Sequence, residues 1–415
     1  MSEDVSIEAS GAETDGARKD GWLVRIAGRR LSSDASVALD LLRALAAILV
    51  MMGHVRGLFF VDFGQVEDKS LVVQAIYFAT ALGHEAVMVF FVLSGYFIAG
   101  NVLRALARSG WSWSWYLVRR VTRLHIVLIP ALVAGLLLDH LGLSLFGADG
   151  PYGAVEAYRA IVPVPVANRL DLFTLLGNAF YLQEIVASPL GSNGPLWSLS
   201  YEFWYYLAFP CLALAAIGGG GPGRRIAWLA GAAAIFAVTG PTIALYFLIW
   251  LAGVVVLAFP GKAGIPVWRY RLGIACAALV LLGMLAGSVS GAYGRIQADF
   301  TVAFAVALLI WALARLPSRS SGNGGLRRAP ALARPARWLA GSSYTLYLVH
   351  LPIVVFLQAW LVSEGGTRWQ PDFVHLAAGA GIALALIAYA ALFGAFTEAR
   401  TDRVRGWLSR RLGIA

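Results

Sequence analysis

Residues 36–60 read SVALDLLRALAAILVMMGHVRGLFF, a mostly apolar run with few charged side chains. A helix needs about 20 mostly apolar residues to cross a bilayer, so this run predicts a membrane-spanning helix. Similar stretches follow at 72–102, 122–142, 197–218, 225–240, 242–260, 271–290, 297–316, 342–363 and 373–397. The sequence therefore predicts an all-α, polytopic integral membrane protein with about ten transmembrane helices.

The fifth and sixth stretches are short, and Thr239-Gly240-Pro241-Thr242 joins them. Glycine and proline interrupt regular structure, so this junction is either a tight turn between two spans or a kink within one. If ten spans is the correct number, both termini lie on the same side of the membrane.

The composition excludes several other classes of protein. Only 13% of the 415 residues are charged, whereas soluble domains carry roughly 25%. The net charge of +10 does not indicate a nucleic-acid binder, because the basic residues lie between apolar runs and not on a soluble, aromatic-basic surface. Cys211 and Cys276 lie inside apolar segments, and the histidines lie on different spans, so neither a disulfide framework nor a metal site is indicated.

The distribution of basic residues predicts the orientation. With the N-terminus in the cytoplasm, 26 of the 33 Lys and Arg residues fall in inner segments, six in outer segments, and Arg43 within the first span. Cytoplasmic loops carry such an excess of positive charge. We therefore expect both termini in the cytoplasm. Arg outnumbers Lys by thirty to three, and Ala and Gly are abundant, which is typical of a GC-rich bacterial genome, so the expected location is a bacterial inner membrane.

This count of spans also defines the segments outside the membrane. Residues 1–34 are expected to be a disordered cytoplasmic tail without a signal peptide, and 398–415 a basic cytoplasmic tail. The membrane domain then occupies 35–397. Its outer loop, 143–196, is long enough to fold on itself over the outer mouth of the bundle, and its inner loop, 317–337, is rich in Gly, Ser, Pro and Arg and reads as a flexible linker.

Ionisable residues at membrane depth are costly and usually mark function. Arg43 and His54 are eleven positions apart in the first span, which places them on one helix face and roughly 16 Å apart along the axis. Arg43 then lies nearer the cytoplasm and His54 nearer the outside. The structural alternative is that Arg43 snorkels to lipid head groups and that His54 lies at the interface.

Further polar residues occur in other spans. Glu202 is expected near the depth of His54, where it could hold the imidazole in one tautomer, as in a base-and-orienter pair. His84 and Glu85 are adjacent and so point to different helix faces, and His350 lies in the ninth span. For each of these residues the alternative is a hydrogen bond that only holds two helices together.

A cluster of arginines begins the third span. Arg119, Arg120 and Arg123 could bind an anion with several phosphates through forked hydrogen bonds, or they could be ordinary positive charge at the inner surface. Three tryptophans stand just before them and predict an interfacial belt: Trp111, Trp113 and Trp115.

Four segments, in order along the chain, resemble the membrane-bound acyltransferase-3 family. They are the Arg-x10-His pattern of Arg43 and His54, the segment Val89–Tyr96 (VFFVLSGY) followed by Arg119-Arg120-x-x-Arg123, the segment Trp197–Phe203 (WSLSYEF), and the segment Ser342–His350 (SSYTLYLVH). One position departs from the family pattern, because Met88 stands where members often have an acidic residue.

The resemblance implies an enzyme that takes an acyl group from acyl-CoA, acetyl-CoA by default, and holds no other bound cofactor. It makes His54 the catalytic base, with Arg43, Glu202 and Arg119–Arg123 as functional positions. His84, Glu85, Ser94, Trp197 and His350 are then polar residues that contact substrate or support the structure, and Ser94-Gly95 permits close helix approach.

We therefore predict O-acylation of a surface glycan or lipid-linked sugar, alongside polysaccharide biosynthesis or export machinery. CoA phosphates would bind the inner arginines, and His54 would activate the acceptor hydroxyl, either for direct transfer or through an acyl-histidine. The sequence also permits acylation of a small molecule or lipid, a proton-coupled transporter, and a structural component of an exporter.

Overall fold

The computed structural model describes residues 21, 31–108, 110–259, 265–317 and 333–414. Within these ranges the chain is helical, and its β contacts are two isolated bridges. Among the described residues, eight helices are long and apolar enough to cross a membrane. The prediction of an all-α, polytopic membrane protein is thus confirmed.

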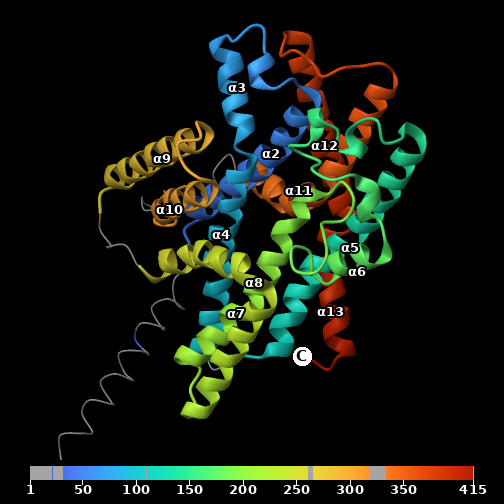
Figure 1. Cartoon of the computed structure of the whole chain (residues 1–415). Coiled ribbons are helices and arrows are strands. Elements are labelled where there is room, and N and C mark those ends of the chain that lie inside the picture. The colour runs from blue at the N-terminus through green and yellow to red at the C-terminus, as the bar shows by residue number, and fades with distance from the viewer. Residues whose placement is uncertain (1–20, 22–30, 109, 260–264, 318–332, 415) are drawn as a thin grey trace, which may run out of the picture.

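Seven of the long helices are α2 (Ser33–Phe59), α4 (Gly83–Ala107), α5 (Trp113–Phe146), α8 (Pro222–Ala258), α9 (Val267–Val289), α10 (Arg295–Leu313) and α11 (Ala333–Ser363). The eighth runs from α12 (Phe373–Phe396) through a 3-10 turn (Glu398–Arg400) into α13 (Thr401–Arg411). Shorter helices are α3 (Leu71–Ala81), α6 (Leu172–Ala179) and α7 (Trp197–Ile217) (Figure 1).

The difference between ten expected spans and eight long apolar helices has two sources. The fifth and sixth stretches run together as α8, but the backbone at Gly240 is non-helical (φ 85°), so two helices meet there at a kink. Glycine adopts this φ at little cost, and Pro241 supplies no amide hydrogen for the helix. The fourth stretch is α7, whose first half, WSLSYEFWYY, is rich in polar and aromatic residues, and it is not among the eight.

The second stretch, 72–102, is two helices and not one. The chain breaks at Leu82 between α3 and α4. Gly83 lies directly against Val50 of α2, and a side chain added at Gly53 would come within 2.9 Å of the Thr80 carbonyl oxygen. His84 and Glu85 therefore belong to the first turn of α4 and not to the interior of a continuous span.

Other boundaries also shift. Most of the expected tail 1–34 and of the loop 317–337 lies outside the described residues, but α2 begins at Ser33, capped by Ser32, and α11 begins at Ala333. The outer loop folds into α6 and several 3-10 turns. The C-terminal tail contains helix α13, which packs on α5.

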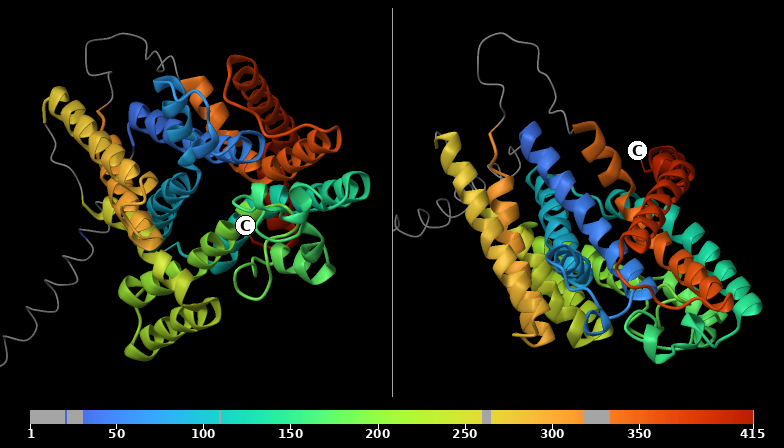
Figure 2. Two further views of the ribbon diagram at one scale, coloured as in Figure 1. Left: turned by 45° about the horizontal axis from the view of Figure 1, so that its top comes forward. Right: turned by 90° about the horizontal axis from the view of Figure 1, so that it is seen from above.

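The bundle has a central group of tightly packed helices and a more exposed pair. Helix α11 packs along α2, and α4 packs against α8 where Gly95 and Gly253 meet. A Cβ atom at Gly95 would lie 1.9 Å from the Trp250 carbonyl oxygen, so this crossing requires glycine, as Ser94-Gly95 predicted. Helices α9 and α10 lie side by side at one edge of the molecule (Figure 2).

Two prolines inside helices leave carbonyl groups that other elements bind. Proline lacks the amide hydrogen that would bond the carbonyl four residues earlier. Pro210 thus frees the Tyr206 carbonyl, which accepts a hydrogen bond from the Tyr116 hydroxyl at 2.9 Å. Pro352 frees the Leu348 carbonyl, which accepts from the Asn193 amide at 2.8 Å. The second bond attaches the outer loop to α11.

Candidate active site

A pair of histidines links α2 to α11. His54 Nδ1 lies 2.8 Å from His350 Nε2, and the two rings stack with centroids 5.0 Å apart. His350 is fully buried, whereas His54 is half-buried. The sequence suggested both residues separately but gave no sign that they form a pair, because 296 positions separate them.

The hydrogen bonds of this pair fix where its protons lie. His350 Nδ1 is 2.8 Å from the Leu346 carbonyl oxygen, which can only accept, so Nδ1 carries the hydrogen. In a neutral imidazole the other nitrogen is then an acceptor, and His350 Nε2 must accept from His54 Nδ1. His54 Nε2 is therefore left without a hydrogen, in the form that a general base requires.

The arginines predicted to bind phosphate gather around a cavity of about 690 Å³. Its walls come from the N-terminal ends of α2 and α5, the C-terminal half of α4, α7, α11 and the segment after α12. We call this the arginine cavity. Its charged lining residues are Asp40, Arg43, Arg119, Arg120, Arg123, Glu202, Glu398, Asp402 and Arg405.

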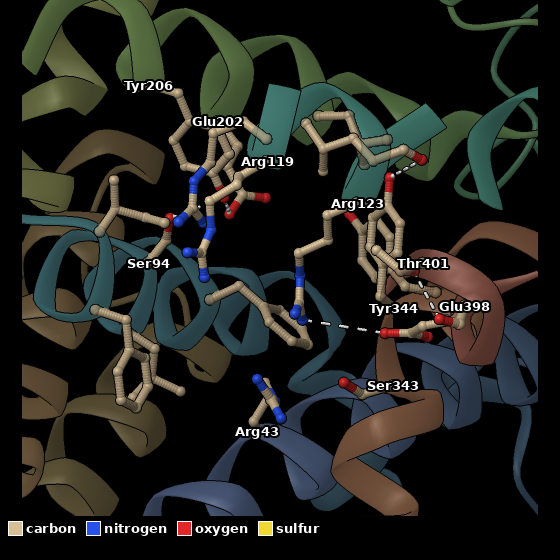
Figure 3. A pocket seen from close by; sticks show the side chains of 18 of the residues that line it. Arg43, Ser94, Arg119, Arg123, Glu202, Tyr206, Ser343, Tyr344, Glu398 and Thr401 are labelled. Carbon is tan, nitrogen blue, oxygen red and sulfur yellow. Dashed lines mark hydrogen bonds and ion pairs between the residues drawn. The ribbon is translucent and has the colours of Figure 1, made fainter. Parts of the chain in front are cut away.

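Several of these charges are already paired. Arg43 contacts Asp40 at 3.2 Å, and Arg123 lies 4.0 Å from Glu398. Glu398 also accepts a hydrogen bond from Thr345 at 3.0 Å. Figure 3 shows Arg123 and Glu398 facing each other across one side of the cavity, with Arg43 nearby.

Arg119 and Arg120 lie over aromatic rings, and no carboxylate partner is present within the described part of the chain. The Arg119 guanidinium is 4.2 Å from the centre of the Trp115 ring, and Arg120 lies between the Tyr116 and Tyr206 rings. The Nε atoms of Arg43 and Arg120 are buried without a hydrogen-bond partner. These guanidinium groups therefore keep donors that an anionic ligand could use.

Glu202 lies in the arginine cavity and not beside His54. Its Oε1 accepts a short hydrogen bond from the Tyr206 hydroxyl one turn later, and Arg119 and Tyr206 lie close to it in Figure 3. His54 has His350 as its hydrogen-bond partner instead. The geometry therefore gives the orienting position to His350, because α11 and not α7 packs along α2.

One wall of the arginine cavity lies close to the histidine pair. Phe90, Ser198 and Tyr347 are among its lining residues. The Tyr347 ring centre is 6.4 Å from that of His350, and its hydroxyl lies 2.8 Å from Ser198 Oγ and 3.0 Å from the Pro195 carbonyl oxygen. Tyr347 thus stands between the cavity and the histidines.

A second polar cluster joins α4 to α8 and α10. His84 Nε2 is 2.8 Å from Asp299 Oδ1, and the Tyr246 hydroxyl donates a short hydrogen bond to Asp299 Oδ2. Trp197 stacks on the His84 ring with centroids 5.8 Å apart. Glu85 points to another neighbour and accepts from Ser288 at 2.7 Å.

Two acidic residues in these clusters were missed by the sequence analysis. Asp299 lies within the predicted span 297–316 and is 1% exposed, so the rule that led to His84 would also have found it. Glu398 lies one position beyond the last predicted span, and its place beside Arg123 depends on the fold. Ser94 accepts a hydrogen bond from the Trp250 indole at 3.1 Å and thus supports the α4–α8 crossing.

Comparisons with known proteins identify the family of this chain. The acyltransferase-3 family profile, described as an acyltransferase domain, matches residues 36–392. Acyltransferase MdmB of Streptomyces mycarofaciens is 31% identical over 389 residues, which cover 85% of this chain and 87% of that protein. No solved structure matches the chain significantly. The match across nearly all of the membrane bundle shows that this chain belongs to the acyltransferase-3 family.

Proposed function

We propose that this protein transfers an acyl group from acyl-CoA to a hydroxyl group, with His54 as the general base. The observation that carries this proposal is the histidine pair, in which the hydrogen bond to Leu346 leaves His54 Nε2 able to take up a proton. The arginine cavity supports it, because unpaired guanidinium donors are suited to the phosphates of CoA.

The orientation follows from the charge distribution. The arginine cavity contains the ends of α2, α4 and α5 that face the cytoplasm under the positive-inside rule, which is where acyl-CoA is made. We place the protein in the bacterial inner membrane and the acceptor on the outer side. A sugar hydroxyl of a surface glycan or lipid-linked saccharide is the proposed acceptor, and acetyl the proposed acyl group.

The proposed acyl transfer needs only a few side chains of this protein. The pantetheine arm would extend from Arg119 and Arg120 toward Tyr347, which brings the thioester near the histidine pair. His54 Nε2 would take the proton of the acceptor hydroxyl as its oxygen attacks the thioester carbonyl. The carbon–sulfur bond then breaks, and the CoA thiolate receives that proton. In the acyl-histidine route, Nε2 itself would attack the thioester first, and the carbon–sulfur bond would break to release the CoA thiolate. The acceptor hydroxyl would then take the acyl group from the histidine and give its proton to the thiolate.

The test uses inside-out membrane vesicles that contain the full chain and radiolabelled acetyl-CoA. We expect label in the glycan fraction with wild type and a loss of at least about a hundredfold with His54→Ala, since general base catalysis contributes roughly 10²–10⁴. His375→Ala is the matched control, because His375 is exposed, pairs with Asp372 and does not line the arginine cavity. It should retain wild-type transfer.

Other outcomes distinguish the alternatives. Equal labelling by wild type and His54→Ala would remove His54 from catalysis. Transfer of label to an added small molecule or lipid in preference to glycan would show that the proposed acceptor is wrong and that the proposed acyl-transfer reaction is correct. Accumulation of an unmodified solute without acyl-CoA, dependent on a proton gradient, would indicate a transporter and overturn the proposal.

A further inference from the structure

A second, smaller cavity lies beside the arginine cavity at the same end of the molecule. It has a volume of about 270 Å³ and is formed by the C-terminal end of α4 and the N-terminal end of α5. Asn101, Arg119 and Arg120 line both cavities. The two spaces therefore share one wall, at the two guanidinium groups for which the described residues supply no carboxylate partner.

The lining of the smaller cavity combines cationic and aromatic groups. Arg104 lies in the last turn of α4 and Arg108 caps that helix, while Trp111 lies just before α5 and Trp115 and Tyr116 lie in its first turn. Arg104 uses one nitrogen to bond Asn101 at 2.7 Å. The Trp111 indole nitrogen is a buried donor without a hydrogen-bond partner. Aromatic faces bind nucleobases by stacking, and guanidinium groups bind phosphates.

The start of α5 adds a further feature that favours an anion. Ser112 caps this 34-residue helix and also lines the smaller cavity. The first amide groups of a helix carry partial positive charge and bind phosphate oxygens. Together with Arg104 and Arg108, they form a site for a phosphate group beside an aromatic surface.

We propose that the smaller cavity binds the adenosine 3′-phosphate end of the CoA donor, and we call it the nucleotide subsite. This inference rests on the proposed function. The shared wall fixes the order of the ligand: the base and its phosphomonoester lie between Arg108 and Trp115, the diphosphate lies at Arg119 and Arg120, and the pantetheine arm continues toward Tyr347.

This assignment changes the interpretation of the tryptophans. The sequence predicts an interfacial belt for Trp111, Trp113 and Trp115, but Trp111 and Trp115 line the cavity and Trp115 lies under the Arg119 guanidinium. A lipid head group would share the phosphate chemistry but would not need an aromatic surface. The nucleotide is thus the ligand that would contact both the cationic and the aromatic groups of the lining.

The experiment compares CoA with 3′-dephospho-CoA, which lacks only the phosphomonoester. Binding of each to the purified full chain in uncharged detergent is measured by calorimetry. We expect wild type to bind CoA about 10- to 100-fold more tightly, as hydrogen bonds to charged groups allow. In Arg108→Ala the preference should fall to about twofold, while affinity for 3′-dephospho-CoA stays at the wild-type value and shows that the variant is folded.

Two further measurements complete the design. Trp115→Ala should weaken both ligands by a similar factor, roughly fivefold or more from lost stacking. Arg225→Ala is the matched control, because Arg225 is an exposed arginine on α8 that lines neither cavity. It should keep the full preference for CoA.

Failure of the subsite and failure of the proposed function give different results. Equal affinity of wild type for the two ligands, with acetyl transfer intact, would overturn the subsite alone. Absence of binding by either ligand, together with no transfer from acetyl-CoA, would overturn the proposed function. A CoA preference that disappears when phosphatidylglycerol is added, but not when phosphatidylcholine is added, would assign the site to a lipid head group and overturn the subsite.

Discussion

At the scale of single residues, His350 acts by setting the tautomer of His54. A glutamine at position 350 can place its side-chain oxygen near the present position of Nε2 and accept from His54 Nδ1, whereas leucine cannot. We expect His350→Gln to retain a measurable share of acyl transfer and His350→Leu to lose about a hundredfold or more. The measurement is kcat and KM for acetyl-CoA in both variants.

The separate effects on kcat and on KM distinguish a role of His350 in positioning the base from a role in folding. If His350 positions the base, kcat falls while KM for acetyl-CoA stays near the wild-type value, because the arginine cavity is unchanged. Equal loss of activity in the glutamine and leucine variants would contradict the role that the geometry gives to the Nε2 acceptor.

At the scale of helices, the α4–α8 crossing depends on two glycines. A Cβ atom at Gly95 would lie 1.9 Å from the Trp250 carbonyl oxygen, and one at Gly253 would lie 2.0 Å from that of Val92. Both neighbours are backbone atoms and cannot move aside locally. Gly95→Ala should therefore force the helices apart and lower the unfolding free energy by about 2–4 kcal/mol, in the range of severe core substitutions.

Thermal unfolding in detergent measures this effect, and α9 offers the control. Gly283 is also helical, but nothing lies within 4 Å of a Cβ atom there. Gly283→Ala should leave the melting temperature unchanged or raise it slightly, because alanine favours helix more than glycine does. A similar melting temperature for Gly95→Ala and Gly283→Ala would show that the crossing tolerates a methyl group.

At the scale of the whole molecule, Arg368 ties together segments that are far apart in the sequence. It donates to the Phe60 carbonyl at 2.8 Å, to both carboxylate oxygens of Asp62 at 2.8 and 3.0 Å, and to the Ala157 carbonyl at 3.1 Å. These contacts join the end of α2, the outer loop and the α11–α12 connection. Arg368 is 9% exposed, whereas Asp62 is 67% exposed.

This contact predicts a dependence of stability on pH. The hydrogen bond from Arg368 lowers the pKa of Asp62 below its ordinary value, so the ionised carboxylate stabilises the fold above the unfolded pKa of about 3.9. That contribution is lost as the pH falls through the lowered folded pKa. Because Asp62 is largely exposed, we expect only about 0.5 kcal/mol.

The matching measurement compares melting temperatures at pH 6 and near pH 3. Asp62→Asn should lower the melting temperature slightly at pH 6, and this deficit should become smaller near pH 3 as the wild-type carboxylate takes up its proton. Arg368→Ala should cost more at both values, because it also removes the bonds to Phe60 and Ala157. If the melting temperature of Asp62→Asn changed between pH 6 and pH 3 by as much as that of wild type, the ion pair would not contribute to the pH dependence of stability.

Much of the bundle could be predicted from the sequence, because hydrophobic length and charge asymmetry are local properties of the chain. The close approach at Ser94-Gly95 was also predicted, since small residues allow two helix backbones to come close together and can be recognised in the sequence. The pairing of His54 with His350 could not be, because it depends on which helix packs against α2. The hydrogen-bond partner of Glu202, which is Tyr206 and not His54, depends on the fold for the same reason. The break at Leu82 is set by the packing of Gly83 on α2.

The hydrogen-bond chain from His54 ends at the Leu346 carbonyl oxygen, and a peptide carbonyl does not store a proton near neutral pH. Among the hydrogen bonds of the described residues, a proton taken up at His54 Nε2 therefore returns from that same nitrogen. Such a pair is suited to taking up and releasing one proton within each turnover.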